Sequence, residues 1–190
     1  MSAGKPDLEL LKDIVAGSHL AFQVLYARHN VRLFRFLMRL TGDRALAEDL
    51  VHDVFLEVWR APGNFGGRSS LMTWIMSIAH NKGVDALRRR GTRYAEDITE
   101  HEIEDDAATP EENTMMNSDA AAIRSCLNRL SPEHKAVIDL VYYHEMPVHD
   151  VSIIAGIPEN TVKTRLFHAR KKLRELLHET GIEGERHERR

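Results

Sequence analysis

The sequence predicts an all-α protein in which two small helical domains are joined by a flexible acidic linker. Apolar residues recur at helical spacing in both halves, and no sustained period-two alternation is present. Between the halves, the stretch from Tyr94 to Ala122 contains ten acids and no lysine or arginine, a composition typical of a solvated linker. We therefore expect a first domain at 1–91, a linker at 92–117, a second domain at 118–180 and a charged tail at 181–190.

The first half is predicted to be a compact helical bundle. Thr41-Gly42-Asp43 provides a helix stop and a new N-cap, so a helix is expected over Arg44–Arg60. Pro62-Gly63-Asn64 and Gly66-Gly67 predict a loop. A last helix is expected from about Ser70 to Arg90, ending in an arginine cluster before Gly91.

The second half contains the pattern of a helix-turn-helix. Ser131-Pro132 is a typical helix start, with serine as the cap and proline in the first turn. A short helix over Val148–Ala155, the turn Gly156-Ile157-Pro158 and a long basic helix from Glu159 to about His178 follow. The N-terminal residues of the second helix of such a motif meet base edges in the major groove. A basic solvated helix surface is the alternative interpretation.

Charge is strongly partitioned although the net charge is only −3. Six basic residues and no acid lie between Lys163 and Arg174, and a second cluster lies at Arg88–Arg90 and Arg93. Such clusters indicate a nucleic-acid partner. No signal peptide and no membrane insertion are expected, so the predicted location is the cytoplasm. The single cysteine, Cys126, is expected to be a buried structural thiol.

A metal enzyme is the alternative from a different functional class. Asp49-x-x-His52 resembles the carboxylate-histidine spacing of di-iron helix bundles. Such a site requires matching motifs on other helices, and no second one lies on an apolar helical face. We therefore predict no catalytic residues, no metal site and no cofactor.

Two segments resemble extracytoplasmic-function RNA polymerase sigma factors of the sigma-70 family: the run AEDLVHDVFLEVW at 47–59 and the run GIPENTVKTRL at 156–166, followed by Ala169-Arg170. By this resemblance, Phe22–Arg90 corresponds to sigma domain 2 and Ala120–Leu177 to sigma domain 4. Ile153 and Ala155 depart from the usual glutamate and leucine, which affects helix packing and partner contacts more than DNA binding.

The resemblance implies that the helix at 44–60 binds core RNA polymerase at the β′ clamp helices, and that the second domain meets the β flap. Acidic residues would provide register and steering on a basic partner surface, and apolar residues would provide burial. Some of the apolar residues are expected in the domain's own core instead. The predicted polymerase-binding residues are Asp49, Leu50, Asp53, Val54 and Glu57.

The resemblance also implies two contacts with promoter DNA. The loop and the helix that follows it would read the separated strand of the minus-ten element, where stacking and amide groups replace the lost base stacking; Phe65 and Trp74 are equally candidates for the core. The predicted minus-ten residues are Asn64, Phe65, Ser69, Trp74, His80, Asn81, Lys82, Arg88 and Arg89. The predicted minus-thirty-five residues are Asn160, Thr161, Lys163, Thr164, Arg165, His168 and Arg170.

Regulation by an anti-sigma factor, over a stress or envelope regulon, is a further expectation from the family. The linker would allow a spread form on polymerase and a compact form under anti-sigma control. It would also screen the two basic clusters in the free protein, which weakens DNA binding without polymerase. A free-standing helix-turn-helix regulator is the closest alternative, but it leaves the first half unexplained.

Overall fold

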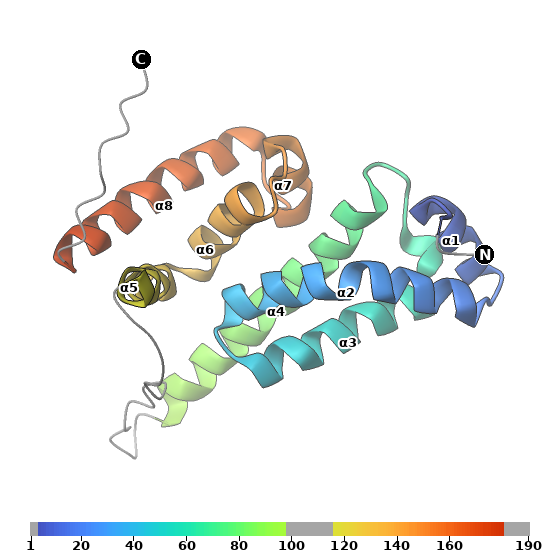
Figure 1. Cartoon of the computed structure of the whole chain (residues 1–190), viewed down its shortest axis with the longest axis horizontal. Helices are drawn as coiled ribbons and strands as arrows, with labels where there is room; N and C mark the ends of the chain where they lie inside the picture. The colour runs from blue at the N-terminus through green and yellow to red at the C-terminus, as the bar shows by residue number, and fades with distance from the viewer. Residues whose placement is uncertain (1–3, 98–115, 181–190) are drawn as a thin grey trace.

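The computed structural model describes residues 4–97 and 116–180, which form two helix bundles with no strand in that part of the chain (Figure 1). The predicted all-α fold with two helical domains is confirmed. The first bundle contains α1 (Asp7–Val15), α2 (His19–Thr41), α3 (Arg44–Arg60), the short 3-10 helix η1 (Pro62–Asn64) and α4 (Leu71–Asp97). The second contains α5 (Met116–Asn128), α6 (Pro132–Ile138), the π-helical turn η2 (Asp139–Tyr143), α7 (Val148–Ala155) and α8 (Glu159–Glu179).

Local caps explain where several of these helices begin and end. The Asp43 carboxylate accepts a hydrogen bond from the Leu46 amide at 3.0 Å, and the Ser131 hydroxyl accepts one from the His134 amide at 3.3 Å. Each satisfies an amide of the first turn that has no partner within the helix. Gly156 ends α7 with φ at 65°, a left-handed conformation that glycine adopts without steric cost. The helices predicted at 44–60 and 148–155 are confirmed.

Helix α4 does not end before Gly91, as the sequence pattern indicates, but continues to Asp97. A glycine inside a helix costs only about 1 kcal/mol, and nothing lies within 4 Å of a Cβ placed at Gly91. Since α5 begins at Met116, both ends of the predicted linker are helical. The remainder of the predicted linker, 98–115, and the tail at 181–190 lie outside the described residues.

Helix α1 has no counterpart in the sequence prediction, and tertiary contacts explain it. Asp7 pairs with Arg28 and lies 2.8 Å from His29 Nε2, both on α2. Leu10 and Ile14 of α1 are buried. A nine-residue helix is marginal on its own, so packing on α2 is what stabilises it.

The first bundle is built on close contact between α2, α3 and α4. Phe36 and Leu40 from α2 and Ile75 from α4 are fully buried. A Cβ at Gly83 would lie 2.7 Å from the Leu40 side chain, so glycine is what allows α4 to approach α2 this closely. Aromatic rings extend this core, with Phe22 in edge contact with Trp59 at 5.2 Å between ring centroids.

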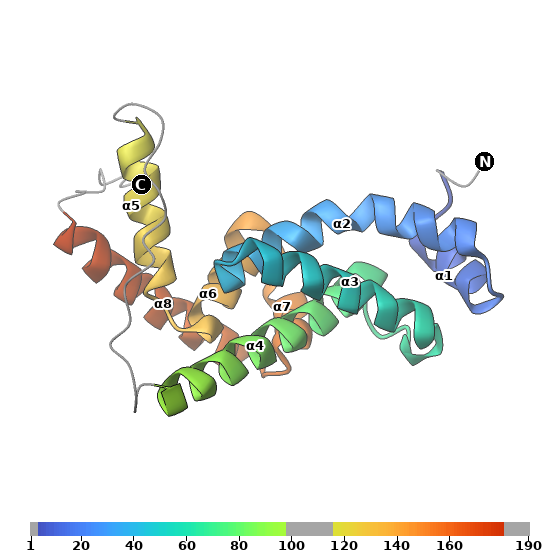
Figure 2. The same cartoon turned by 90° about the horizontal axis from the view of Figure 1, so that it is seen from below.

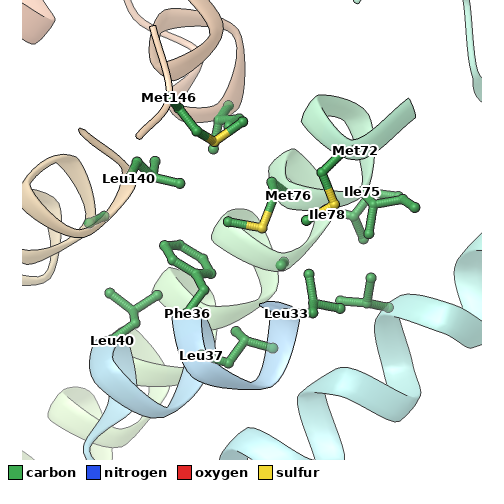
Figure 3. Close-up of a cluster of buried hydrophobic side chains, with 14 of the residues drawn as sticks. Leu33, Phe36, Leu37, Leu40, Met72, Ile75, Met76, Ile78, Leu140 and Met146 are labelled. Atoms are coloured by element: carbon green, nitrogen blue, oxygen red, sulfur yellow. The ribbon is translucent and has the colours of Figure 1, made fainter. Parts of the chain in front are cut away.

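The second bundle packs directly on the first, in what we call the compact arrangement. Leu140 and Met146 lie opposite Phe36 and Met76, which come from α2 and α4 (Figure 3). All four belong to one continuous buried cluster that spans both bundles. Helix α4 lies along α7 and also contacts α6, so it runs beneath the second bundle (Figure 2).

A polar group closes the edge of this contact. Arg39 on α2 forms an ion pair with Asp139, whose side chain is only 4% exposed. Arg32 donates a hydrogen bond to the His144 carbonyl oxygen at 2.8 Å, and its Nε lies 3.2 Å from His144 Nδ1. His144 Nε2 in turn lies 3.1 Å from the Asp139 carboxylate. The buried side chains of Asp139 and His144 therefore both have polar partners, as is usual for buried polar groups.

Candidate nucleic-acid interface

The recognition helix of the predicted helix-turn-helix is α8, and it separates a buried face from a polar face. Val162, Leu166 and Ala169 are buried against the rest of the second bundle. Arg165 is half-buried. The other predicted minus-thirty-five residues are exposed on α8: Asn160, Thr161, Lys163, Thr164, His168 and Arg170. The arrangement presents hydrogen-bond donors and positive charge together, as major-groove binding requires.

One exposed residue of this surface, Phe167, was not among the sequence predictions. Its side chain is 59% exposed, and its ring lies 5.5 Å from that of His168. The signal that identifies it is its phase: Phe167 falls outside the buried spacing of Val162, Leu166 and Ala169. An exposed apolar ring beside Thr164 and His168 suits contact with a thymine methyl group.

The predicted minus-ten loop brings Phe65 and Trp74 together. Their ring centroids lie 5.6 Å apart and both side chains are half-buried, so each contributes to packing and retains an accessible part. Asn64 is exposed on the same loop. Ser69 is half-buried, and its hydroxyl donates a hydrogen bond to the Ser70 carbonyl at 3.2 Å. The loop therefore offers an aromatic pair bordered by small polar groups.

Further along α4, the predicted minus-ten residues differ in their environments. Asn81 is exposed, whereas Lys82 forms an ion pair with Glu57 on α3 at 2.9 Å. His80 is only 6% exposed. Lys82 is thus paired within the first bundle, and His80 is shielded from solvent.

The arginine cluster in the second half of α4 is exposed, and its members contact nearby oxygen acceptors. Arg88 lies 3.7 Å from Asp85, and Arg89 donates to the Asp85 carbonyl oxygen at 3.3 Å. Arg90 pairs with Asp43 at 2.8 Å. The hydrogen bond from the Leu46 amide is the main cause that lowers the pKa of the Asp43 carboxyl below its ordinary value, and the hydrogen bond from Arg90 is the second. The guanidinium groups are accessible to phosphate oxygens.

The acidic helix α3 divides its predicted polymerase-binding residues between surface and core. Asp49 and Asp53 are exposed, and Glu57 is half-buried. Leu50 and Val54 are 5% and 0% exposed and lie in the core of the first bundle, so the acidic residues form the accessible part of this set. A groove of about 470 Å³ separates α3 from α4, lined by Asp43, Leu46, Asp49, Leu50, Asp53, Ala86, Arg89 and Arg90.

Neither a metal site nor a membrane span is found in the part of the chain that the structure describes. Among the described residues, no group of three histidine, cysteine or carboxylate side chains is arranged to hold a metal ion. The side chains of Asp49 and His52 are both exposed to solvent. None of the described helices is long and apolar enough to cross a membrane. Cys126 is 1% exposed, so the prediction of a buried thiol is confirmed.

Comparison with known protein families places the two bundles in a known order. The model of Sigma-70 region 2 matches residues 25–93, and the model of Sigma-70, region 4 matches residues 120–173. These spans contain, respectively, the acidic α3 with the arginine cluster of α4, and the helix-turn-helix.

Similar proteins match most of the chain. It is 35% identical to the ECF RNA polymerase sigma factor SigL of Mycobacterium tuberculosis, over 84% of this chain and 90% of that relative. It is 33% identical to the RNA polymerase sigma factor CarQ of Myxococcus xanthus, over 88% and 95% of the two chains. A solved structure of the sigma factor RpoE, in complex with the anti-sigma factor NepR from Bartonella quintana, aligns with a TM-score of 0.66 and 28% identity over 83% of this chain and 96% of that one.

Proposed function

Because this chain belongs to the extracytoplasmic-function RNA polymerase sigma factors of the sigma-70 family, we propose that it directs core polymerase to promoters through the three surfaces described above. The observation that carries this proposal is the order of those surfaces in one chain. An acidic face on α3 comes first, the arginine-rich α4 follows, and the exposed basic face of α8 comes last.

Polymerase binding is assigned to the acidic face of α3. Asp49 and Asp53 are exposed and line the groove beside Arg89 and Arg90, so binding there would bring polymerase next to cations that suit promoter phosphates. Glu57 is already paired with Lys82, so we expect it to contribute less to polymerase binding than Asp49 and Asp53 do. We assign no direct polymerase contact to Leu50 and Val54, because both are buried.

Promoter reading is assigned to two separate helices. On α8, the exposed polar residues, together with Arg165, would read the duplex of the minus-thirty-five element in its major groove. On α4 and its preceding loop, the Phe65–Trp74 pair and Asn64 would hold separated bases of the minus-ten element. Polymerase would keep the two helices at the spacing that the promoter requires.

The compact arrangement is assigned to the free protein. His80 lies beneath the second bundle, and Arg165 is half-buried, so residues of both promoter-reading helices are partly occupied by contacts within the chain. We therefore expect weak promoter binding in the absence of polymerase. This expectation rests on direct packing of the bundles, whereas the sequence-based hypothesis relied on screening by the linker.

An anti-sigma factor is the proposed regulatory partner. The similar sigma factor RpoE has been solved in complex with the anti-sigma factor NepR. We infer that this chain is likewise held by an anti-sigma factor, in the cytoplasm where core polymerase works. Such a partner would act by favouring the compact arrangement over the spread form.

The polymerase interface is tested by reversing charge on α3. Asp49→Lys together with Asp53→Lys should weaken binding to core polymerase by several kcal/mol, because like charges would face each other across the interface. Affinity for core enzyme and core-dependent transcription in vitro measure the effect. The matched control is Glu9→Lys, a reversal at an exposed position of α1. Unchanged affinity in the double variant, with an unchanged helical circular dichroism spectrum, would contradict the assignment.

A further inference from the structure

His80 is buried on α4, the helix that packs against α6 and α7, and it lacks a full set of hydrogen bonds. It is 6% exposed, and its Nδ1 lies 3.4 Å from the Asn81 side-chain oxygen. Its Nε2 is the one buried side-chain nitrogen or oxygen among the described residues that has no hydrogen-bond partner. Protonation would add an N–H group and a positive charge at a buried position where the protein offers that nitrogen no acceptor.

The second bundle brings positive charge to this histidine. Arg165 on α8 acts electrostatically on both His80 and His134, and His168 on α8 acts on His134. Glu133 on α6 is the acid that opposes them. His80 and His134 are therefore both influenced by the same arginine and the same glutamate of the second bundle.

Other charged groups of the packed elements have partners of their own. On α6, Lys135 donates a hydrogen bond to Asn128 at 3.3 Å, and the buried Asp139 of η2 pairs with Arg39 and His144. Lys82 on α4 is paired with Glu57 on α3 at 2.9 Å. On α7, which packs along α4, His149 is paired with Glu159 at 3.0 Å. Asp150 is the other charged residue of α7 and is half-buried. Arg165 and Glu133 are therefore the charges of the second bundle that act on His80, in addition to its burial.

We propose that His80 on α4 and His134 on α6 make the packing of the two bundles acid-responsive: the bundles stay together while both side chains are neutral and separate when both are protonated. This inference rests on the proposed function, in which the compact arrangement keeps α4 away from promoter DNA. Acidification would thereby expose the minus-ten helix, and the signal would be the proton itself.

The direction of the effect follows from the pKa values. Burial lowers the pKa of both His80 and His134 below the ordinary value of 6.5, and the positive charge of Arg165 lowers both further. Glu133 raises both pKa values, and the hydrogen bond to Asn81 raises that of His80, but the net direction is downward for each histidine. In the spread form both side chains regain ordinary values. The stabilisation of the compact arrangement is thus complete above about pH 6.5 and is lost as the pH falls from there towards the lowered pKa values.

Small-angle X-ray scattering of the full chain between pH 7.5 and pH 5 tests this contact directly. The radius of gyration should rise as the pH falls below about 6.5, while circular dichroism shows that the helices persist. Each unit by which a histidine pKa is lowered should shift the ratio of spread to compact molecules by about tenfold. His80→Gln combined with His134→Gln should remove most of this pH dependence. His178→Gln, at an exposed position near the end of α8, should retain it.

A second variant keeps the test decisive if the double variant does not fold. Arg165→Gln removes the cation that opposes protonation, so its pH dependence should be weaker than that of the wild type. A radius that stays constant in the wild type over this range, or that rises equally in the wild type and in the folded double variant, would overturn the proposal. Core-dependent transcription by the wild type at pH 7.5 tests the proposed function separately, because it does not depend on any response to acid.

Discussion

The two predicted promoter-reading helices, α4 and α8, are presented in opposite ways. On α8 the predicted DNA contacts lie mainly on the exposed face, opposite a buried stripe. Helix α4, in contrast, packs against α6 and α7, and its His80 is buried. The compact arrangement therefore hinders reading of the minus-ten element more than reading of the minus-thirty-five element.

This difference arises from what each bundle buries. The first bundle encloses large side chains of its own, such as Leu25 and Phe55. The second bundle is smaller and places Leu140 and Met146 against the first (Figure 3). Covering α4 thus completes the core of the second bundle, and opening the molecule requires that apolar surface to be exposed or bound by a partner.

The largest effect on this comparison is expected from Asp139→Ala. The substitution leaves Arg39 and His144 without their shared carboxylate at the contact between the bundles. Removing one partner of a buried pair costs about 3–5 kcal/mol, and we expect about 2–3 kcal/mol here because the Arg39 side chain is 31% exposed. Urea unfolding measures the loss, and scattering should show a larger radius. Glu175→Ala, which removes an exposed pair with Lys172, is the control and should change stability little.

The second effect concerns α8 and should depend on DNA sequence. Arg165→Ala should weaken binding of polymerase holoenzyme to a minus-thirty-five duplex by about 2 kcal/mol, since a good contact between an arginine and a base is worth about 1–3 kcal/mol. Lys171→Ala, farther from the start of the helix, should mainly reduce the salt dependence of binding. Transcription from promoters that depend on the upstream element measures the difference. Equal activity of Arg165→Ala and the wild type would exclude this placement of α8.

A smaller effect is expected from Phe167→Ala. If the exposed ring contacts a thymine methyl group, its loss should cost about 1 kcal/mol at one base position and leave stability unchanged. Competition between duplexes that carry thymine or uracil at each position would locate the contact, because uracil lacks the methyl group. Identical discrimination by the variant and the wild type would show that Phe167 lies away from the bases.

The smallest effect is expected from Glu145→Gly in the turn between η2 and α7 of the second bundle. Glu145 has a φ of 53°, the one positive φ outside glycine in the described part of the chain, and its side chain is exposed. Glycine adopts this conformation without strain, so the substitution should stabilise the protein by about 1 kcal/mol. Gly156→Ala, at a φ of 65°, is the opposite change and should destabilise it by a similar amount. Thermal unfolding of both variants checks the sign.

The sequence alone predicted the parts of the fold that depend on local signals. Asp43 and Ser131 act as the expected N-caps, and Gly156 ends the first helix of the helix-turn-helix. Where tertiary contacts compete with local preference, prediction was less complete. Helix α4 continues through Gly91, and α1 is stabilised by the contacts of Asp7 with α2.

The candidate site divides in the same way. The exposed face of α8 follows from the spacing of Val162, Leu166 and Ala169, because a helix that buries one stripe exposes the opposite one. The pairing of Lys82 with Glu57 and the burial of His80 do not follow from spacing. They depend on which helix packs over α4.

The sequence by itself determined the all-α class, the two bundles and the chemistry of their surfaces, because apolar period, helix caps and charge clusters are local properties of the chain. Only the tertiary structure decided that the bundles pack together, that Arg39 meets Asp139 and that His80 lies near Arg165. Arg39 and Asp139 are separated by 100 positions along the chain. No local pattern specifies such a pair, since the free energy that brings its members together comes from burial of apolar side chains on both bundles at once.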